Sequence, residues 1–138
     1  MTDMTKEQID LLKRLQPFFR EKMRFVKRGD EFIFEVVPND WRVGFHYEMD
    51  SNLEYHTEAS RQREGYNTLC IPKLIDWQYP ERGLIEMLKQ DKHFVGLFAS
   101  EKGWACQVHL VDSPILYSYE ASDPFTALLM ALCAQEGV

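Results

Sequence analysis

Residues 79–138, YPERGLIEMLKQDKHFVGLFASEKGWACQVHLVDSPILYSYEASDPFTALLMALCAQEGV, show the pattern of a helix, three strands and a second helix. Pro80 fits the first turn of a helix that runs to about Lys89, because proline is tolerated where the backbone N–H has no helical partner. Short polar turns separate three strand-like stretches, 93–99, 104–111 and 115–120. Ser122 or Asp123 then caps a helix rich in Ala and Leu. The stretch therefore predicts a complete helix–three-strand–helix unit.

Residues 1–30 form a predicted N-terminal helical region. Thr5 and Gln8 have the spacing of a capping box, in which each side chain bonds the backbone N–H of the other residue. Apolar residues then recur every three or four positions, which is typical of an amphipathic helix; they are Ile9, Leu12, Leu15, Phe19 and Met23. Pro17 lies inside this pattern and is expected to kink the helix or divide it in two.

Residues 31–49 predict a β-hairpin. The stretch 31–37 is rich in β-branched and aromatic residues, with Phe32, Phe34 and Val36 on one face. From Trp41 to Met49 apolar and polar side chains alternate, and Pro38-Asn39-Asp40 is the turn between the two strands. Together with 79–138, this hairpin predicts a single α+β domain over 1–138. We expect a mainly antiparallel sheet of about five strands, with N-terminal, middle and C-terminal helices packed on it.

Composition narrows the classes of function. The chain has 138 residues, a net charge of −6 and 45% hydrophobic residues. A net negative charge argues against nucleic acid as a partner, because phosphate binding depends on Lys and Arg. It fits ordinary solubility first and a basic protein partner second. No stretch approaches the ~20 apolar residues that span a bilayer, so no membrane association is expected.

The cysteines, Cys70, Cys106 and Cys133, are odd in number and widely spaced. This pattern fits neither a disulfide framework nor a zinc site, and it indicates buried free thiols in a reducing compartment. The N-terminus has no basic region followed by an apolar run, so no signal peptide is visible. We therefore expect a cytoplasmic protein.

No motif for catalysis, a cofactor or a metal is recognisable. The chain lacks a Gly-x-Ser-x-Gly elbow, a glycine-rich phosphate loop and a His-Glu-x-x-His pattern. One alternative is open, because His46 and Glu48 share the polar face of one strand and His109 lies on the polar face of another. If these strands were neighbours, the three side chains could form a metal or acid–base site. Exposed polar residues on a one-sided sheet are the favoured explanation of the pattern, because His and Glu are ordinary there, and we expect no enzyme.

Aromatic residues are more frequent than a core of this size needs, at 13% of the chain. Tyr and Trp are enriched at protein interfaces, because they combine apolar area with a polar group. The predicted interaction surface therefore consists of Trp41, Tyr47, Trp77 and Tyr79. The polar stretch 50–65, which exceeds the usual loop length, is a second candidate. The partner is an unknown protein or, in a homodimer, a second copy of the chain.

The run Leu69-Cys70-Ile71-Pro72-Lys73-Leu74-Ile75-Asp76, followed by Tyr79-Pro80-Glu81-Arg82-Gly83-Leu84, resembles a segment of uncharacterised phage and prophage proteins of bacteria. The ending, residues 120–132, is similar to the helix that closes the alpha-beta-alpha sandwich domain of small phage proteins. The resemblance covers about the second half of the chain. It implies a mobile-element origin and a fold, and it brings no catalytic residues.

These observations predict a small cytoplasmic accessory protein of phage or prophage type that binds another protein and does not catalyse a reaction. Two other classes stay open. An inhibitor or immunity-type protein would block a host or competitor enzyme, and small size and negative charge allow it. An enzyme of unrecognised type would use the His/Glu residues named above.

Overall fold

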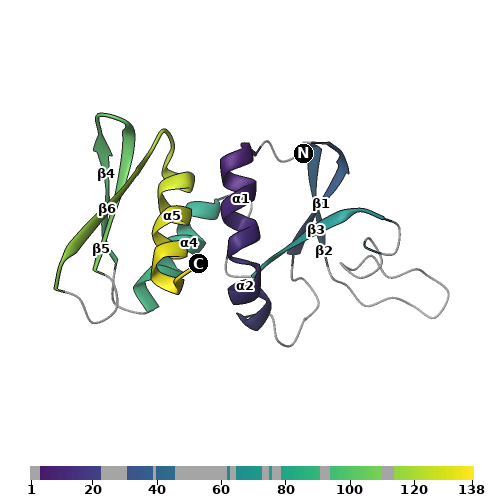
Figure 1. Cartoon of the computed structure of the whole chain (residues 1–138), viewed down its shortest axis with the longest axis horizontal. Helices are drawn as coiled ribbons and strands as arrows, with labels where there is room; N and C mark the ends of the chain where they lie inside the picture. The colour runs from purple at the N-terminus through teal and green to yellow at the C-terminus, as the bar shows by residue number, and fades with distance from the viewer. Residues whose placement is uncertain are drawn as a thin grey trace. The chain divides into compact units, whose positions relative to one another are not determined.

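The computed structural model describes residues 4–22, 31–38, 40–45, 62, 65–72, 75, 79–90, 94–109 and 114–138. The chain divides into two compact units, unit 1 (residues 1–73) and unit 2 (residues 74–138). Each unit combines helices with a three-stranded antiparallel sheet (Figure 1).

The N-terminal region of unit 1 forms two short helices, α1 (Lys6–Arg14) and α2 (Gln16–Lys22). The predicted capping box is confirmed: the Thr5 N–H donates to Gln8 Oε1 at 3.0 Å, and the Gln8 N–H donates to Thr5 Oγ1 at 3.1 Å. Leu15 ends α1, and Pro17 is the second residue of α2. Proline is accepted there because the first turn of a helix leaves its N–H groups unpaired. The predicted division of the helix is therefore confirmed.

The sheet of unit 1 has the strand order β2-β1-β3 and is antiparallel throughout. Its strands are β1 (Glu31–Val37), β2 (Asp40–Phe45) and β3 (Asn67–Ile71). The predicted hairpin is β1–β2. Ile33 lies at the centre, opposite Val43 on one side and Leu69 on the other, and it is fully buried. β3 completes the sheet from a distant part of the sequence.

The side chain of Gln16 closes the outer edge of β3. Its Oε1 accepts from the Cys70 N–H at 2.7 Å, and its Nε2 donates to the Cys70 carbonyl at 3.1 Å. The same Nε2 lies 3.1 Å from the Leu12 carbonyl. In an antiparallel sheet alternate residues of an edge strand turn both backbone groups away from the neighbouring strand. Gln16 therefore satisfies the outward-facing pair of Cys70 as another strand would.

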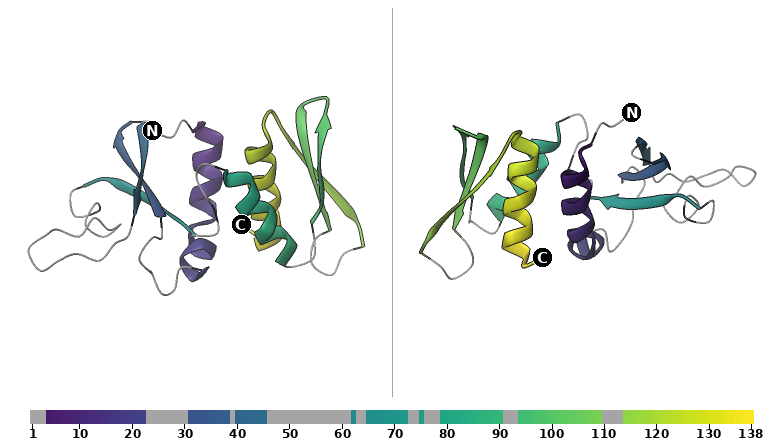
Figure 2. Two further views of the ribbon diagram at one scale, coloured as in Figure 1. Left: turned by 180° about the vertical axis from the view of Figure 1, so that it is seen from behind. Right: turned by 45° about the horizontal axis from the view of Figure 1, so that its top comes forward.

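Unit 2 consists of two helices and a meander of three strands, as predicted for 79–138. Its elements are α4 (Pro80–Gln90), β4 (Phe94–Ser100), β5 (Gly103–His109), β6 (Leu116–Ala121) and α5 (Pro124–Glu136). The strand order is β4-β5-β6. Both helices lie on the same face of this sheet, α5 against β5 and β6, and α4 against α5 and β4 (Figure 2).

The turn between β4 and β5 requires a glycine. Gly103 has φ +124°, and a Cβ there would stand 2.7 Å from the Ser122 carbonyl oxygen. The close approach therefore joins the β4–β5 turn to the end of β6. A side chain would both strain the backbone and separate these two segments.

Helix α5 is the buried element of unit 2. Asp123 is its N-cap, with Oδ1 accepting from the Thr126 N–H at 2.8 Å and Oδ2 accepting from the Thr126 hydroxyl at 2.7 Å. Gly137 ends the helix in the left-handed conformation, with φ 72°. Eight of its residues are buried, and they surround the helix instead of forming one stripe; they are Phe125, Thr126, Ala127, Leu128, Leu129, Ala131, Leu132 and Cys133.

The predicted α+β class and the antiparallel pairing are confirmed. The part of the chain that the structure describes has six strands, close to the expected five, and they form two sheets of three. Whether 1–138 behaves as one domain stays a prediction, which an experiment described below tests. The described helices include none long and apolar enough to cross a membrane.

Candidate functional site

Two of the four predicted contact residues lie within the described ranges. Trp41 belongs to β2 and is only 3% exposed, so its ring offers almost no area to a partner. Tyr79 precedes α4 and is 50% exposed, with the guanidinium carbon of Arg82 5.0 Å from its ring centre. Tyr47 and Trp77 fall outside the described residues. Of the two residues that the structure describes, Tyr79 has the exposure that an interaction surface requires.

The alternative His/Glu site depended on two strands being neighbours. His109 ends β5, where its Nδ1 lies 3.3 Å from the Ile115 carbonyl oxygen. His46 and Glu48 fall outside the described residues, and β2, the strand that leads to them, belongs to the other sheet. The strand pairing that this alternative requires is therefore not found among the described strands. Nor do the described residues contain a group of three or more His, Cys, Asp or Glu that could hold a metal ion.

The face of the unit 2 sheet that α4 and α5 leave uncovered carries exposed apolar side chains. The register places Phe98, Ala105 and Glu120 in one row across the three strands, and His109 beside Leu116 in another. We call this surface the open face; its residues are Gly96, Phe98, Ala105, Gln107, His109, Leu116, Ser118 and Glu120. The opposite face contains Cys106 and Val108, which are fully buried.

Phe98 and Leu116 are the large apolar side chains of the open face, and each is 47% exposed. The Phe98 ring lies over Gly96, so closely that a Cβ on that glycine would stand 2.5 Å from a ring carbon. Ala105, the cross-strand partner of Phe98, is buried although it lies on the open face. Because Gly96 and Ala105 are small, the Phe98 ring can pack flat against the sheet while its other side is exposed to solvent.

The charge of the chain is concentrated in unit 2. Residues 74–138 contain nine Asp or Glu and four Lys or Arg, which gives a net charge of −5. Residues 1–73 contain thirteen Asp or Glu and twelve Lys or Arg, which gives a net charge of −1. At the edge of the open face, Lys102 Nζ lies 3.9 Å from Glu120 Oε2, and both side chains are exposed. An exposed pair of this kind contributes little to stability. The acidic excess of unit 2 favours a basic partner.

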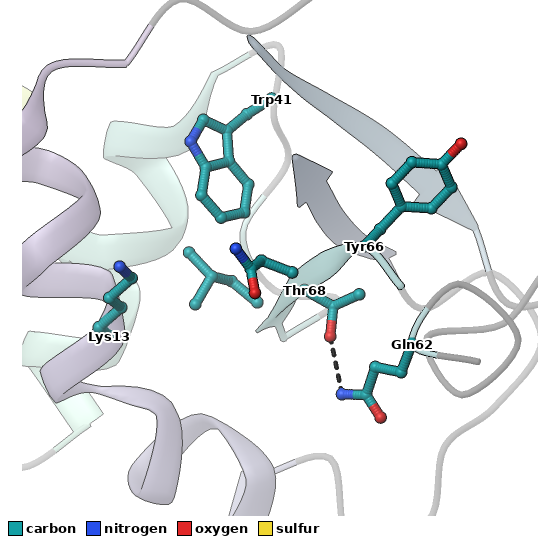
Figure 3. Close-up of a pocket in the computed structure, with 7 residues that line it drawn as sticks. Lys13, Trp41, Gln62, Tyr66 and Thr68 are labelled. Carbon is teal, nitrogen blue, oxygen red and sulfur yellow. Dashed lines mark hydrogen bonds between the residues drawn. The ribbon is translucent and has the colours of Figure 1, made fainter. Parts of the chain in front are cut away.

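Unit 1 has a pocket of about 360 Å³ beside β3. Its walls come from α1, β2, β3 and the residues that lead into β3 (Figure 3), namely Lys13, Trp41, Gln62, Tyr66, Asn67, Thr68 and Leu69. Trp41 and Leu69 are buried and supply the apolar wall. The volume falls in the range of small-molecule sites, which is ~300–1,000 Å³.

Hydrogen bonds fix the polar side chains of this pocket. Gln62 Nε2 donates to Thr68 Oγ1 at 2.8 Å, and Asn67 Nδ2 donates to Glu35 Oε1 at 3.1 Å. Figure 3 shows the Gln62–Thr68 bond on one side of the pocket and Lys13 on the other. Lys13 is the only residue with a formal charge among the lining residues. The pocket therefore combines an aromatic wall, oriented amides and one cation.

All three cysteines are buried and free, as predicted. Burial raises the pKa of the Cys106 thiol to about 12. The pKa of Tyr119, which faces Cys106 across the β5–β6 pair, is also raised, first by burial and then by Tyr117 and Cys106. A thiol with so high a pKa is a poor nucleophile, because the thiolate is the reactive form. Cys106 is therefore a core residue.

Sequence reasoning missed both the pocket and the open face. The continuous apolar run of β4, Phe94-Val95-Gly96-Leu97-Phe98, was a usable signal for the open face, since such a run places apolar side chains on both faces of a strand. For the pocket no comparable signal exists, because Lys13 and Gln62 look like ordinary surface residues in the sequence.

Comparison of the chain with models of known protein families, with curated proteins and with solved structures gave no match. The resemblance of 69–84 and 120–132 to phage and prophage proteins therefore stays a prediction.

Proposed function

We propose that this protein is a non-catalytic accessory factor that binds a basic protein partner through the open face of unit 2. The observation that carries the proposal is the exposure of Phe98 and Leu116 on a sheet face that neither helix of the unit covers. The two side chains lie at opposite corners of the open face, two strands and two rows apart. Exposed apolar side chains on an uncovered face are typical of sites of protein interaction. An aromatic anchor such as Phe98 is typical of the residues that contribute most to binding energy.

The charge of unit 2 supports the choice of partner. With a net charge of −5, the unit attracts basic proteins and repels nucleic acid. The polar residues of the open face, Gln107, His109 and Ser118, would form the hydrogen-bonding surroundings of the two apolar anchors. Tyr79 is half exposed but precedes α4, which packs on the opposite face of the sheet, so it belongs to a separate surface.

A cytoplasmic location and a phage or prophage origin belong to the same proposal. The resemblance of Pro80-Glu81-Arg82-Gly83-Leu84 and of the capped helix after Asp123 to small phage proteins supports the origin. The acidic charge of unit 2 also favours an inhibitor or immunity-type role, in which the partner is a basic enzyme. The two roles differ in one measurable respect, because only the inhibitor abolishes an activity of its partner.

The experiment that tests the proposal starts with the tagged full chain and a lysate of a bacterial host. Bound proteins are identified by mass spectrometry, and a stoichiometric one is purified and titrated against the wild type and a Phe98→Glu, Leu116→Glu variant. Replacing both apolar side chains by carboxylates is expected to weaken binding at least ~100-fold, since the two large apolar contacts of the open face are lost. Thermal melting followed by circular dichroism is the control that tests whether the variant is folded.

A matched control separates the open face from exposed apolar residues in general. Val37 ends β1 in unit 1 and is 55% exposed, so Val37→Glu makes the same chemical change on the other unit. We expect Val37→Glu to bind like the wild type, and Tyr79→Ala as well, because Tyr79 precedes the helix that packs on the opposite face of the sheet. A folded Phe98→Glu, Leu116→Glu variant that binds as tightly as the wild type would overturn the proposal, as would the absence of any stoichiometric partner.

A further inference from the structure

We infer that the pocket of unit 1 is a binding site for a small aromatic carboxylate. This inference is independent of the proposed function, because the pocket and the open face belong to different units and share no residue. It depends on the convergence of an apolar ring surface, oriented amide groups and one ammonium group on a single cavity.

The size of the pocket limits the ligand. A volume of about 360 Å³ equals that of about a dozen water molecules at liquid density. A ligand with one or two fused rings and a short acidic group fills such a space. A nucleotide or a peptide of several residues is too large to be enclosed in it.

The walls of the pocket select a ring. Tyr66 is half-buried and is the lining aromatic ring with area left for a ligand, whereas Trp41 and Leu69 are 3% and 4% exposed and add only a small part of the apolar wall (Figure 3). Aromatic side chains prefer a stacked or edge-to-face contact with another ring, which contributes more than the buried area alone. An aliphatic ligand of the same volume would lose that additional contribution. The apolar part of the ligand is therefore aromatic.

Lys13 selects the charge of the ligand. It is the single charged residue of the lining, it lies in the last turn of α1, and its side chain is exposed at the edge of the pocket. None of the ion pairs between described residues involves it. An ammonium group at the mouth of a partly apolar cavity attracts a carboxylate more strongly than it would in open water, because the local dielectric constant is lower.

The polar side chains are already oriented before a ligand binds. Asn67 is held by its bond to Glu35, and Gln62 by its bond to Thr68. Groups that are fixed in this way lose little conformational entropy when they accept or donate a further bond to a ligand. They supply orientation, while Tyr66 supplies the ring contact and Lys13 the charge.

The test uses the full chain and two probes that differ only in charge, indole-3-carboxylate and indole-3-carboxamide. Each is titrated while the NMR signals of the Trp41 indole N–H and the Thr68 backbone amide are followed. We expect the carboxylate to shift both signals and to bind about tenfold more tightly than the carboxamide, the order of effect of one charge-assisted bond. Signals of unit 2 residues, such as the Trp104 indole N–H, should not move.

Two substitutions on the same helix make the test specific. Lys13→Gln should remove the preference for the carboxylate and leave the affinity for the carboxamide unchanged. Lys6→Gln, which removes an equally exposed lysine that does not line the pocket, should keep the preference. The inference is overturned if neither probe shifts the Trp41 and Thr68 signals at millimolar concentration. It is also overturned if the carboxylate preference survives in a folded Lys13→Gln variant.

Discussion

The two units contain the same kinds of element and connect them differently. In unit 2 each strand pairs with the next one along the chain, in the order β4-β5-β6. In unit 1 the third strand, β3, passes the hairpin and pairs with β1, so the order is β2-β1-β3. A meander is specified by local turns, whereas the β1–β3 pair must close a loop that contains all of β2. The elements of unit 2 can therefore be predicted from the sequence, whereas the strand pairing of unit 1 can be predicted only in part.

The units also satisfy their exposed backbone and apolar surface by different means. Unit 1 closes the edge of β3 with the side-chain amide of Gln16, which forms two bonds to Cys70. Unit 2 relies on α5, a helix that is apolar on all sides, to cover one face of its sheet. Removing the Gln16 amide costs hydrogen bonds, and truncating a buried side chain of α5 leaves a cavity. The costs of these losses differ in size, so mutations can test the comparison.

The largest effect is expected for Leu128→Ala in α5. Leu128 is fully buried, and removing a buried leucine side chain costs about 2–5 kcal/mol of unfolding free energy, from lost transfer energy and the cavity left behind. Met130→Ala in the same helix removes a half-buried side chain and should cost less. Urea denaturation measures both, and a cost below ~1 kcal/mol for Leu128→Ala would contradict the central place of α5.

The same variant tests whether 1–138 is one domain. Amide hydrogen exchange reports the stability of each unit separately. Exchange that becomes faster in Leu128→Ala only over 74–138 would make unit 2 an independent cooperative unit. An equal increase over 1–73 would make the whole chain one cooperative domain, as the sequence analysis predicts.

A smaller loss is expected when the amide on the edge of β3 is removed. Gln16→Leu keeps the size of the side chain and deletes both bonds to the Cys70 backbone, which should cost about 1–3 kcal/mol. Gln16→Glu retains an acceptor for the Cys70 N–H but places a carboxylate oxygen against the Cys70 and Leu12 carbonyl oxygens, so at neutral pH its cost should be at least as large as that of Gln16→Leu. Gln90→Leu, at an exposed position in α4, should change stability by less than ~0.5 kcal/mol. Equal stability of the Gln16→Leu and Gln90→Leu variants would show that Gln16 does not close the edge.

Gln16 also shows where sequence reasoning ends. The capping box at Thr5, the division at Pro17 and every element of unit 2 follow from local patterns, because caps, prolines and alternation act over a few residues. The bond from Gln16 to Cys70 joins residues 54 positions apart, and a glutamine in a helix carries no sign of its partner. The pocket has the same origin, since Lys13, Trp41 and Thr68 come from three elements that only the fold brings together.

The helix caps allow a like-for-like comparison of the two units. Asp123 accepts two bonds from Thr126, whereas Thr5 accepts one from Gln8. Removing an N-cap side chain costs ~0.5–2 kcal/mol, so we expect Asp123→Ala near the upper end and Thr5→Ala near the middle. Thermal melting of the two variants gives the order. A larger loss for Thr5→Ala would mean that the second bond to Thr126 contributes nothing.

The smallest effect at neutral pH concerns Cys106. Its pKa is about 12 in the folded chain and near 9 in the unfolded chain. Between these values the unfolded chain releases the proton while the folded chain keeps it, so the unfolded state gains stability as pH rises. Below pH 9 both states hold the proton and the term vanishes. Cys106 should therefore reduce the free energy of unfolding above pH 9, by at most ~1.4 kcal/mol per pH unit.

Urea denaturation at pH 7 and pH 10.5 measures this loss, and Cys106→Val should make it smaller. Part of the loss should persist, because the raised pKa of Tyr119 acts in the same direction. A thiol reagent at pH 8 provides a second readout, since a buried thiol that stays protonated reacts only when the unit opens. If Cys106 reacts in the native chain as fast as in urea, the sheet face beneath α5 is accessible to solvent. Unit 2 would then lack the closed core that the burial of α5 indicates.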